Sequence, residues 1–419
     1  MRLFFCAIFC LGLSGSASAA DTGLKPVSDA LKAVRGTHNP RSQYDAGPEL
    51  TPVKHALRRW IEGQLPKLGQ HGKVDRFSKT LTDAIEAANL TCDAVPADEK
   101  RCTENARDNP GQTNNRGYLA AIDASYLEDG RYLVVQTNVG IRCGFDESAY
   151  VYEWRGNSWK PLLQSEQNDY HDKHYSPQNF LSIQASFANV AWNKPAPRPP
   201  LILTLGYSPW CQSNWQTLYT RLWRASAQTQ TPAPLVDTKD SMFLGDNPAR
   251  ARMSDDDVLI EFDGDSVDGG KLVRPHLRHY AVRDNKVARI APIALKPDDF
   301  VEEWLTRPWT ESATWSDQPS DDPALQKWYG SFHAGAEIIF GEFDGAPLHC
   351  RRDKTLWQVG FTQQAGPKNP EVTAHFLVRW MAPYRFTIVK VQKEKFPGCD
   401  VKDAVPDNLG TLVPLPSGK

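Results

Sequence analysis

Two histidines stand three residues apart in a polar segment, and each has an aspartate close to it in the chain. His171 and His174 alternate with Asp169 and Asp172. Imidazole and carboxylate groups at this spacing are suited to hold a divalent ion such as zinc. The segment predicts a metal site and, with a third ligand, a metal-dependent hydrolase. A polar loop between two strands is the favoured interpretation.

A third ligand for such a site is available in a later segment that contains His276 and His279. If this segment is a strand, residues three apart point to opposite faces. The two imidazoles then cannot both serve one site without a bend in the strand.

A glycine-rich run from 263 to 270 offers carboxylate oxygens from Asp263, Asp265 and Asp268. It resembles a calcium loop only superficially, because the third acidic residue comes one place late and no glutamate closes the loop. A solvated hairpin turn is the favoured interpretation. The chain shows no nucleophile elbow, phosphate loop, dinucleotide fingerprint or His-Glu-x-x-His motif, so no other cofactor is expected.

Among the 13 tryptophans of the chain, two flank a cysteine in one loop. Trp210 and Trp215 stand on either side of Cys211, and Tyr207 precedes them at the end of an apolar run. Exposed rings next to polar groups suit stacking on a sugar ring or gripping a peptide. This loop is the predicted ligand-binding site, whereas the other tryptophans are better explained as filling between sheets.

A short helix is expected over residues 297–305, where Asp299 and Glu302 are placed as a capping box. The adjacent pair Glu302 and Glu303 is interpreted as part of exposed caps and turns. The pair is a weaker candidate for the two carboxylates of a glycosidase.

The elements that would position these residues repeat along the chain. An apolar strand, a loop with one cysteine and an alternating aromatic strand occur at 131–155 and again at 201–225. A third, less regular unit spans 258–292. Antiparallel meanders that begin roughly 55 to 70 residues apart predict propeller-like blades or stacked sheets. The expected fold class is mainly β with a small helical N-terminal part.

Composition divides the rest of the chain. Residues 21–50 show no clear period and are expected to form a loose leader, followed by helices at 51–65 and 74–89. The expected organisation is a signal peptide at 1–20, a leader and helical region at 21–116, repeated β units at 117–296, a helical, Trp-rich connection at 297–330, a C-terminal antiparallel sheet at 331–401 and a tail at 402–419.

The first twenty residues predict export. Met1-Arg2 is followed by an apolar run to Leu13 and by Ala17-Ser18-Ala19, which is the pattern of a cleaved signal peptide. A periplasmic or extracellular location is therefore expected, with no membrane-spanning segment in the mature chain. The formal net charge of −2, without a long run of one sign, gives no case for nucleic-acid binding.

Six cysteines remain after cleavage, and an even number in an exported chain predicts disulfides. The preferred pairing joins neighbours in sequence and the equivalent loops of the two repeated units. The predicted pairs are Cys92–Cys102, Cys143–Cys211 and Cys350–Cys399.

These patterns favour a non-enzymatic exported β scaffold that binds a glycan, a peptide or a protein partner through its inter-strand loops. One alternative is a metal-dependent hydrolase that uses His171 and His174. Another is a structural protein of the cell envelope. The sequence specifies neither the ligand nor the partner.

Overall fold

The computed structural model describes most of the chain between residues 21 and 402. The described ranges are 21–36, 47–92 and 116–402, the last without 128–129, 142–143, 169, 171–177, 187–198, 209–212, 226–231, 246–248, 255, 284–285, 335–338, 367–369 and 383.

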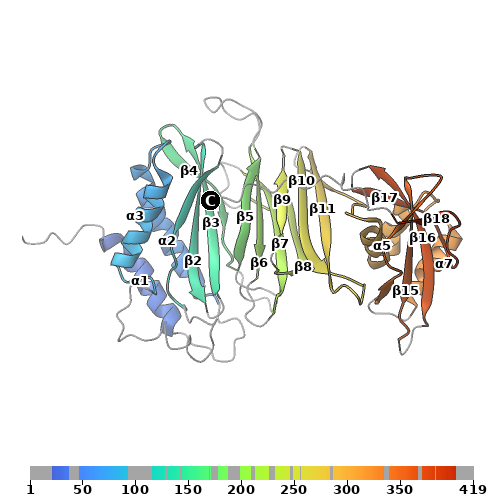
Figure 1. The fold of residues 1–419 in the computed structure, drawn as a ribbon. Helices are drawn as coiled ribbons and strands as arrows, with labels where there is room; N and C mark the ends of the chain where they lie inside the picture. Colours follow the sequence, from blue (N-terminus) through green and yellow to red (C-terminus); the bar gives the residue numbers. More distant parts are fainter. Residues whose placement is uncertain are drawn as a thin grey trace, which may run out of the picture.

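The elements form a row of layers (Figure 1). Three helices lie at one end, three four-stranded antiparallel sheets follow, and a C-terminal unit of helices and a six-stranded sheet lies at the other end. This arrangement confirms the expected fold class, mainly β with a helical N-terminal part. In the described part of the chain the sheets are stacked and do not close into a ring, so the stacked-sheet alternative describes the molecule.

The first helix shows that the expectation of a loose leader was wrong. Helix α1 covers Asp21–Gly36, and its apolar side chains are buried against α2 and the first sheet. The buried residues are Leu24, Val27, Leu31 and Val34. Their spacing of three and four residues is the stripe of an amphipathic helix. Gly23 and Pro26 in the same segment suggest a turn from composition alone, but the apolar stripe determines the structure.

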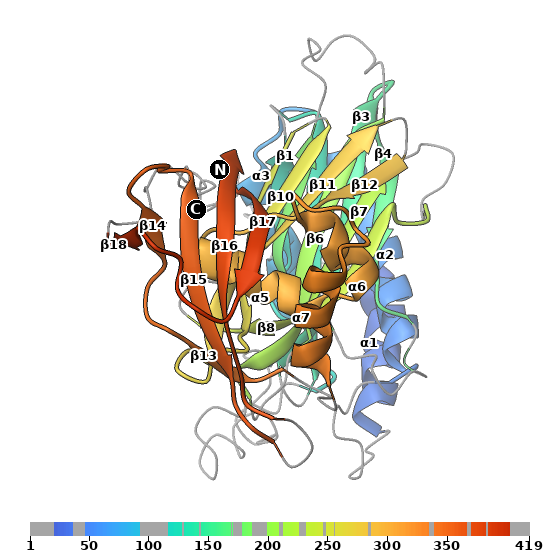
Figure 2. The same ribbon diagram turned by 90° about the vertical axis from the view of Figure 1, so that its right-hand side faces the viewer.

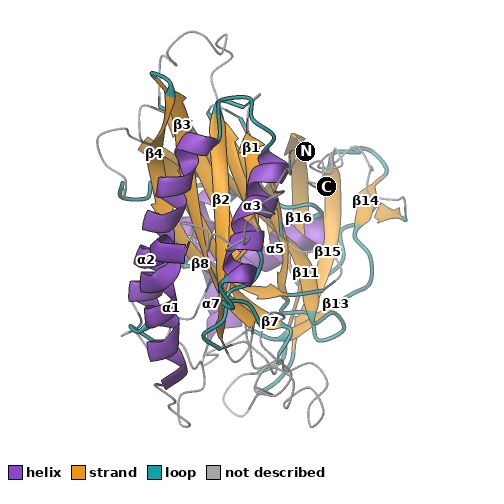
Figure 3. Cartoon of the chain, turned by 90° about the vertical axis from the view of Figure 1, so that its left-hand side faces the viewer, coloured by secondary structure: helices purple, strands orange, loops and turns teal. Residues whose placement is uncertain are grey.

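The next two helices agree with the prediction. Helix α2 covers Leu50–Gln64, the 3-10 turn η1 covers Leu65–Lys67 and helix α3 covers Val74–Ala87. Thr51 lies inside α2 and does not cap it. Figure 3 shows the three helices in front of the first sheet, which they cover on one face.

The three stacked sheets are antiparallel meanders. The first contains β1 (Asp123–Leu127), β2 (Tyr132–Ile141), β3 (Gly144–Arg155) and β4 (Ser158–Ser165). The second contains β5 (Asn179–Ser186), β6 (Leu201–Tyr207), β7 (Trp215–Arg224) and β8 (Val236–Phe243). The third contains β9 (Arg250–Met253), β10 (Asp257–Asp265), β11 (Val273–Arg283) and β12 (Lys286–Ile290).

Each of these sheets is covered on both faces, which explains the nearly continuous apolar runs of their central strands. In β6, Leu203 packs towards the third sheet, whereas the preceding residue, Ile202, packs towards the first. In β10, Ile260 faces the second sheet and Leu259 faces the C-terminal unit. A sheet with one wet face would instead alternate apolar and polar residues.

The C-terminal unit packs four short helical segments on a sheet (Figure 2). The helical segments are α5 (Pro297–Thr306), α6 (Trp309–Ser312), η3 (Ala313–Trp315) and α7 (Pro323–His333). The strands are β13 (Gly341–Phe343), β14 (Leu348–Cys350), β15 (Leu356–Gln363), β16 (Val372–Ala382), β17 (Arg385–Gln392) and β18 (Cys399–Val401).

The core of this unit accounts for the tryptophans of the expected Trp-rich connection. Trp304 and Trp315 are buried, and Trp309 and Trp328 are partly buried against the same core. They fill the space between helices and sheet, as the sequence suggested. No helix among the described residues has the length and apolar character needed to cross a membrane.

The predicted disulfide between Cys350 and Cys399 is confirmed, and it joins β14 to β18. Cys92 is also disulfide-bonded. Cys102, Cys143 and Cys211 lie outside the described ranges, so the other two predicted pairs stay predictions.

Candidate functional site

The structure places two of the three predicted ligand-binding rings at one end of the second sheet. Tyr207 ends β6, and its hydroxyl accepts a hydrogen bond from Nδ2 of Asn179 at 3.3 Å. Trp215 begins β7 and packs edge-on against Phe243, with ring centroids 5.4 Å apart. Both rings are half-buried and already have partners within the chain. Trp210 lies outside the described residues.

Of the candidate metal ligands, His171 and His174 also lie outside the described residues. The two later histidines face different surroundings, as their spacing on a strand predicted. The Nδ1 atom of His276 lies 3.2 Å from Oε1 of Glu303 in the interior, whereas His279 pairs with Asp257 and keeps 24% of its side chain exposed.

The aspartates of the glycine-rich run belong to the β10–β11 hairpin. Asp263 and Asp265 lie on β10, and the main-chain oxygen of Asp265 is 2.9 Å from Nε2 of His276. Asp268 lies in the turn, where its Oδ1 accepts the N–H of Gly270 at 3.0 Å. In the described ranges, no three His, Cys, Asp or Glu side chains are grouped so that they could hold a metal ion.

A pocket that the sequence analysis did not single out lies where the β3–β4 hairpin meets the end of α2. Its cavity volume is about 340 Å³, at the lower end of the range of small-molecule sites. We call it the aromatic pocket, and its lining residues are Glu62, Leu65, Pro66, Tyr152, Trp154, Asn157, Ser158, Trp159, Lys160 and Pro161.

The aromatic wall of this pocket is built by a tight hairpin turn. Gly156 and Asn157 have φ angles of 53° and 66°, so both central residues of the two-residue turn are left-handed, as a type I′ turn requires. The turn places Trp154 directly opposite Trp159 in the strand register. Their rings meet edge to face, with centroids 5.2 Å apart and an angle of 71° between the planes.

The inner tryptophan of the pair is fixed before any ligand arrives. The Nε1–H of Trp159 donates to the main-chain oxygen of Leu68 at 2.8 Å, just after η1. Its ring also stacks against Tyr126, with centroids 6.0 Å apart. Trp159 is buried, whereas Trp154 is only partly buried and is the more accessible of the two. A fixed ring beside an accessible one is a preorganised surface, which lowers the entropic cost of binding.

Tyr152 is one of the lining residues of the pocket that carry a polar group. It lies two residues before Trp154 on β3, so both side chains are on the face that the helices cover. The side chain is 1% exposed, and its hydroxyl has no hydrogen-bond partner among the described residues. Burial, with the negative charge of Glu62 adding to it, raises the pKa of Tyr152 well above its usual value. The hydroxyl therefore stays protonated and can donate a hydrogen bond.

Glu62, near the end of α2, supplies the acceptor. Burial is the main cause that raises the pKa of Glu62, and the nearby carboxylate of Glu166 raises it further. The charge of Arg58 acts in the opposite direction, but that guanidinium is already paired with Glu166, with Nη1 2.9 Å from Oε1. The pocket thus combines ring faces, a carboxyl acceptor and a hydroxyl donor that no described residue engages, which is the composition of a binding site for a small polar ligand.

The sequence carries a signal for this site that the analysis did not use. A tryptophan stands two residues before Gly156 and another two residues after Asn157. Once the Gly-Asn pair is assigned to a two-residue turn, the two indoles must pair across the hairpin. The packing of α2 and η1 against the two indoles depends on tertiary contacts, so the local sequence does not predict it.

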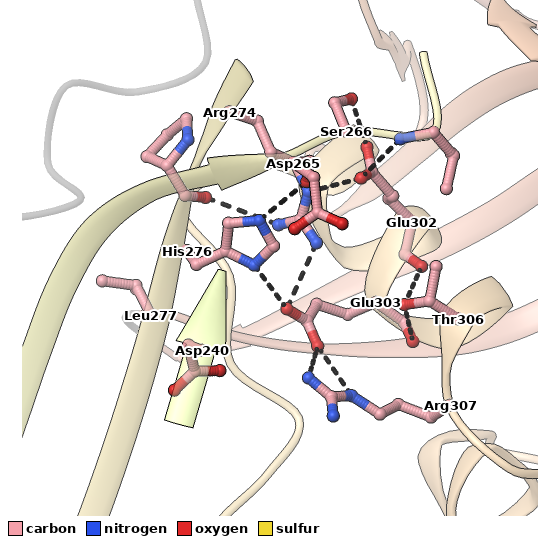
Figure 4. A network of polar contacts seen from close by, with 12 residues as sticks. Asp240, Asp265, Ser266, Arg274, His276, Leu277, Glu302, Glu303, Thr306 and Arg307 are labelled. Atoms are coloured by element: carbon pink, nitrogen blue, oxygen red, sulfur yellow. Dashed lines mark hydrogen bonds and ion pairs between the residues drawn. The ribbon is translucent and has the colours of Figure 1, made fainter. Parts of the chain in front are cut away.

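Another strongly perturbed acidic group, Glu303, lies in a buried ionic network between β11 and α5 (Figure 4). One oxygen of Glu303 lies 3.2 Å from nitrogens of Arg274, His276 and Arg278. The other oxygen accepts two hydrogen bonds from Arg307, at 3.0 and 2.9 Å. Burial acts to raise the pKa of Glu303, but the hydrogen bond from His276 and the three arginine charges outweigh it and hold the pKa well below its usual range.

The neighbouring carboxylate completes this junction. Glu302 accepts hydrogen bonds from the Val267 N–H at 2.9 Å and the Ser266 hydroxyl at 2.8 Å. Its Oε1 also lies 2.8 Å from Nε of Arg274. Arg278 extends the network to Asp240 on β8, at 2.8 Å. The network therefore ties the second and third sheets to the first helix of the C-terminal unit.

The interpretation of Glu302 and Glu303 as exposed caps is therefore wrong. Their side chains are buried, with exposures of 2% and 4%, because α5 turns this part of its surface towards β11. The expected capping box is also absent from α5, which begins after Lys296 without a side-chain cap. The carboxylates of this network are paired with arginines of the same chain, so we assign the network a structural role.

No model of a known protein family matches this chain, and a comparison with curated proteins finds no significant match.

Proposed function

We propose that this protein acts outside the cytoplasm as a non-catalytic scaffold that binds a glycan, a peptide or a protein partner. The stacked sheets are the rigid part, and their hairpins and loops carry the binding groups. Binding and catalytic residues commonly occur on such connections, because a rigid framework positions them.

The observation that carries this proposal is the aromatic pocket. It has an accessible indole next to a fixed one, and a buried tyrosine hydroxyl that no described group satisfies. A buried hydroxyl without a partner costs free energy in the unliganded protein. A ligand that bonds to this hydroxyl would remove that cost, so the pocket has a physical reason to be occupied.

Two features support an exported location. The first twenty residues have the pattern of a signal peptide, and Cys350 and Cys399 are joined in a disulfide. Structural disulfides persist mainly in oxidising compartments. The experiment for this part is expression of the full chain in a bacterial host, followed by fractionation and N-terminal sequencing of the product. Cleavage after Ala19 or Ala20 is the expected result, and an intact Met1 in the cytoplasm would contradict it.

The binding function is tested with the mature protein purified from an oxidising compartment without chelator. Glycan and peptide arrays should give saturable binding that weakens in a Trp154→Ala variant. Turnover of a substrate that a single substitution abolishes would overturn the non-catalytic assignment. Elemental analysis of the same sample addresses the alternative: stoichiometric zinc, lost in a His171→Ala/His174→Ala variant, would favour a metal-dependent hydrolase.

A further inference from the structure

The aromatic pocket has chemistry that narrows the class of its ligand. We infer that it binds a neutral sugar residue of a glycan, with the sugar ring on the indole of Trp154 and its hydroxyl groups bonded to Tyr152 and Glu62. This inference rests on the proposed binding function and names the ligand of that site.

The first argument is the pairing of an apolar wall with polar groups. A pyranose ring has C–H groups on its faces and hydroxyls around its rim, so it fits a site with an aromatic surface and several polar groups at its edges. The accessible indole of Trp154 supplies the surface, and Tyr152 and Glu62 are among the residues of the same lining. Amphipathic aromatic side chains are suited to such contacts.

The second argument is the need for both a donor and an acceptor. The Tyr152 hydroxyl is protonated and has no partner among the described residues, so it has one hydrogen bond to donate and can accept others. The carboxyl group of Glu62 is an acceptor when ionised. A sugar hydroxyl both donates and accepts, so adjacent hydroxyls of one ring can satisfy the two groups together.

The third argument is charge. An anionic ligand would be repelled by the carboxylate of Glu62. Burial already raises the pKa of this group, so a second negative charge beside it is unfavourable. A cationic ligand would meet Lys160, which is exposed at the rim of the same pocket. A neutral ligand avoids both repulsions, and the volume of about 340 Å³ admits one or two sugar rings and no long chain.

The test is a calorimetric titration of the mature protein with neutral oligosaccharides chosen from a glycan array. Tyr152→Phe removes only the hydroxyl and should weaken binding about five- to tenfold, the effect of one hydrogen bond. Trp154→Ala should weaken it by about tenfold or more, and Trp154→Phe should retain part of the affinity because a smaller ring still stacks. Trp328→Ala, at a partly buried tryptophan on α7, is the matched control and should leave binding unchanged.

Glu62→Gln separates a neutral ligand from a cationic one. The amide keeps an acceptor oxygen but loses the charge, so binding of a neutral sugar should change by less than about threefold. Preferential binding of an alkylammonium compound such as choline, lost in Glu62→Gln, would overturn the assignment to a sugar.

Two further outcomes would separate this inference from the proposed function. If sugar binding persists in Trp154→Ala and Tyr152→Phe but is lost in Trp215→Ala, the assignment of a sugar ligand holds, but its assignment to the aromatic pocket fails. If arrays show peptide binding and no sugar binding, the glycan assignment fails while the scaffold function stands. Thermal unfolding of each variant shows whether a loss of binding reflects a loss of fold.

Discussion

Lys54 on α2 and Asp146 on β3 form an ion pair with 2.6 Å between Nζ and Oδ2, and neither side chain has any exposed surface. The ammonium group also donates to the Gln167 carbonyl and to the Tyr170 hydroxyl, both at 2.5 Å. Two charges removed from water are tolerated only when their geometry is good and their remaining hydrogen bonds are made. This pair therefore fixes how the helical layer sits on the first sheet.

Removing one member of this pair should be strongly destabilising. Lys54→Met leaves the buried carboxylate of Asp146 without its cation, and we expect the free energy of unfolding to fall by about 3 to 5 kcal/mol. Chemical denaturation of the mature protein measures this change. The double variant Lys54→Met/Asp146→Leu should recover most of the loss, because no uncompensated charge remains. The exposed pair of Lys79 with Asp83 provides the control, and Lys79→Met should have no measurable effect.

Glu147 should make the protein less stable as the pH rises. Burial is the main cause that raises its pKa to about 7, with the charges of Asp146 and Asp123 adding to it and the N–H of Phe180 opposing it. Between pH 4.5 and 7 the folded protein holds a proton that the unfolded chain has lost, so stability falls across this window.

The substitution Glu147→Gln removes this proton linkage while its amide oxygen can still accept the Phe180 N–H. At pH 8 the variant should be more stable than the wild type by about 3 kcal/mol, and at pH 4 the two should be equal. Urea denaturation across this pH range measures the difference. A gap that does not change with pH would mean that Glu147 ionises normally in the folded protein.

Glu303 should have the opposite pH dependence. Its pKa is held well below the usual range, so its contribution to stability is present above pH 4.5 and is lost as the pH falls through the lowered pKa. Glu303→Gln leaves the cations of β11 without their shared anion, and the expected loss is about 3 to 5 kcal/mol at pH 7.

The control for this variant is Glu311→Gln, at a more exposed carboxylate that lies 3.5 Å from Arg289. It should change the free energy of unfolding by less than about 1 kcal/mol. The prediction fails if the two variants are equally stable at pH 7, or if the deficit of Glu303→Gln stays constant down to pH 3.

Much of the secondary structure could be predicted because its signals are local. The apolar strand of the unit expected at 201–225 begins at Leu201 in the structure, and the helices expected at 51–65 and 297–305 lie within one residue of α2 and α5 at each end. The misses have physical causes. Strand β9 has only four residues, two of them arginines, and lies at the edge of its sheet. Strand β8 has a polar middle, so an apolar pattern does not cover its full length. Short or polar strands owe their existence to their neighbours, which a local pattern does not record.

The candidate site was harder to predict than the fold. The Trp154–Trp159 pair follows from the hairpin turn, but the pocket also needs Glu62, which is separated from it by about ninety residues of chain. The same limit explains the error at Glu302 and Glu303. Adjacent acidic residues in a short helix ordinarily face water. Only the docking of α5 on β11 places them in the interior.

The disulfide between Cys350 and Cys399 should contribute measurably to the stability of the C-terminal unit. It closes a loop with a sequence separation of 49 and thereby restricts the unfolded chain. The double variant Cys350→Ser/Cys399→Ser should lose about 2 to 4 kcal/mol of unfolding free energy. Guanidinium denaturation under oxidising conditions measures this loss, and the tryptophan-rich core around Trp304 provides the fluorescence signal. Because the aromatic pocket lies at the other end of the row of layers, ligand affinity should be unchanged. A variant as stable as the wild type would show that the unfolded chain is already compact in this region.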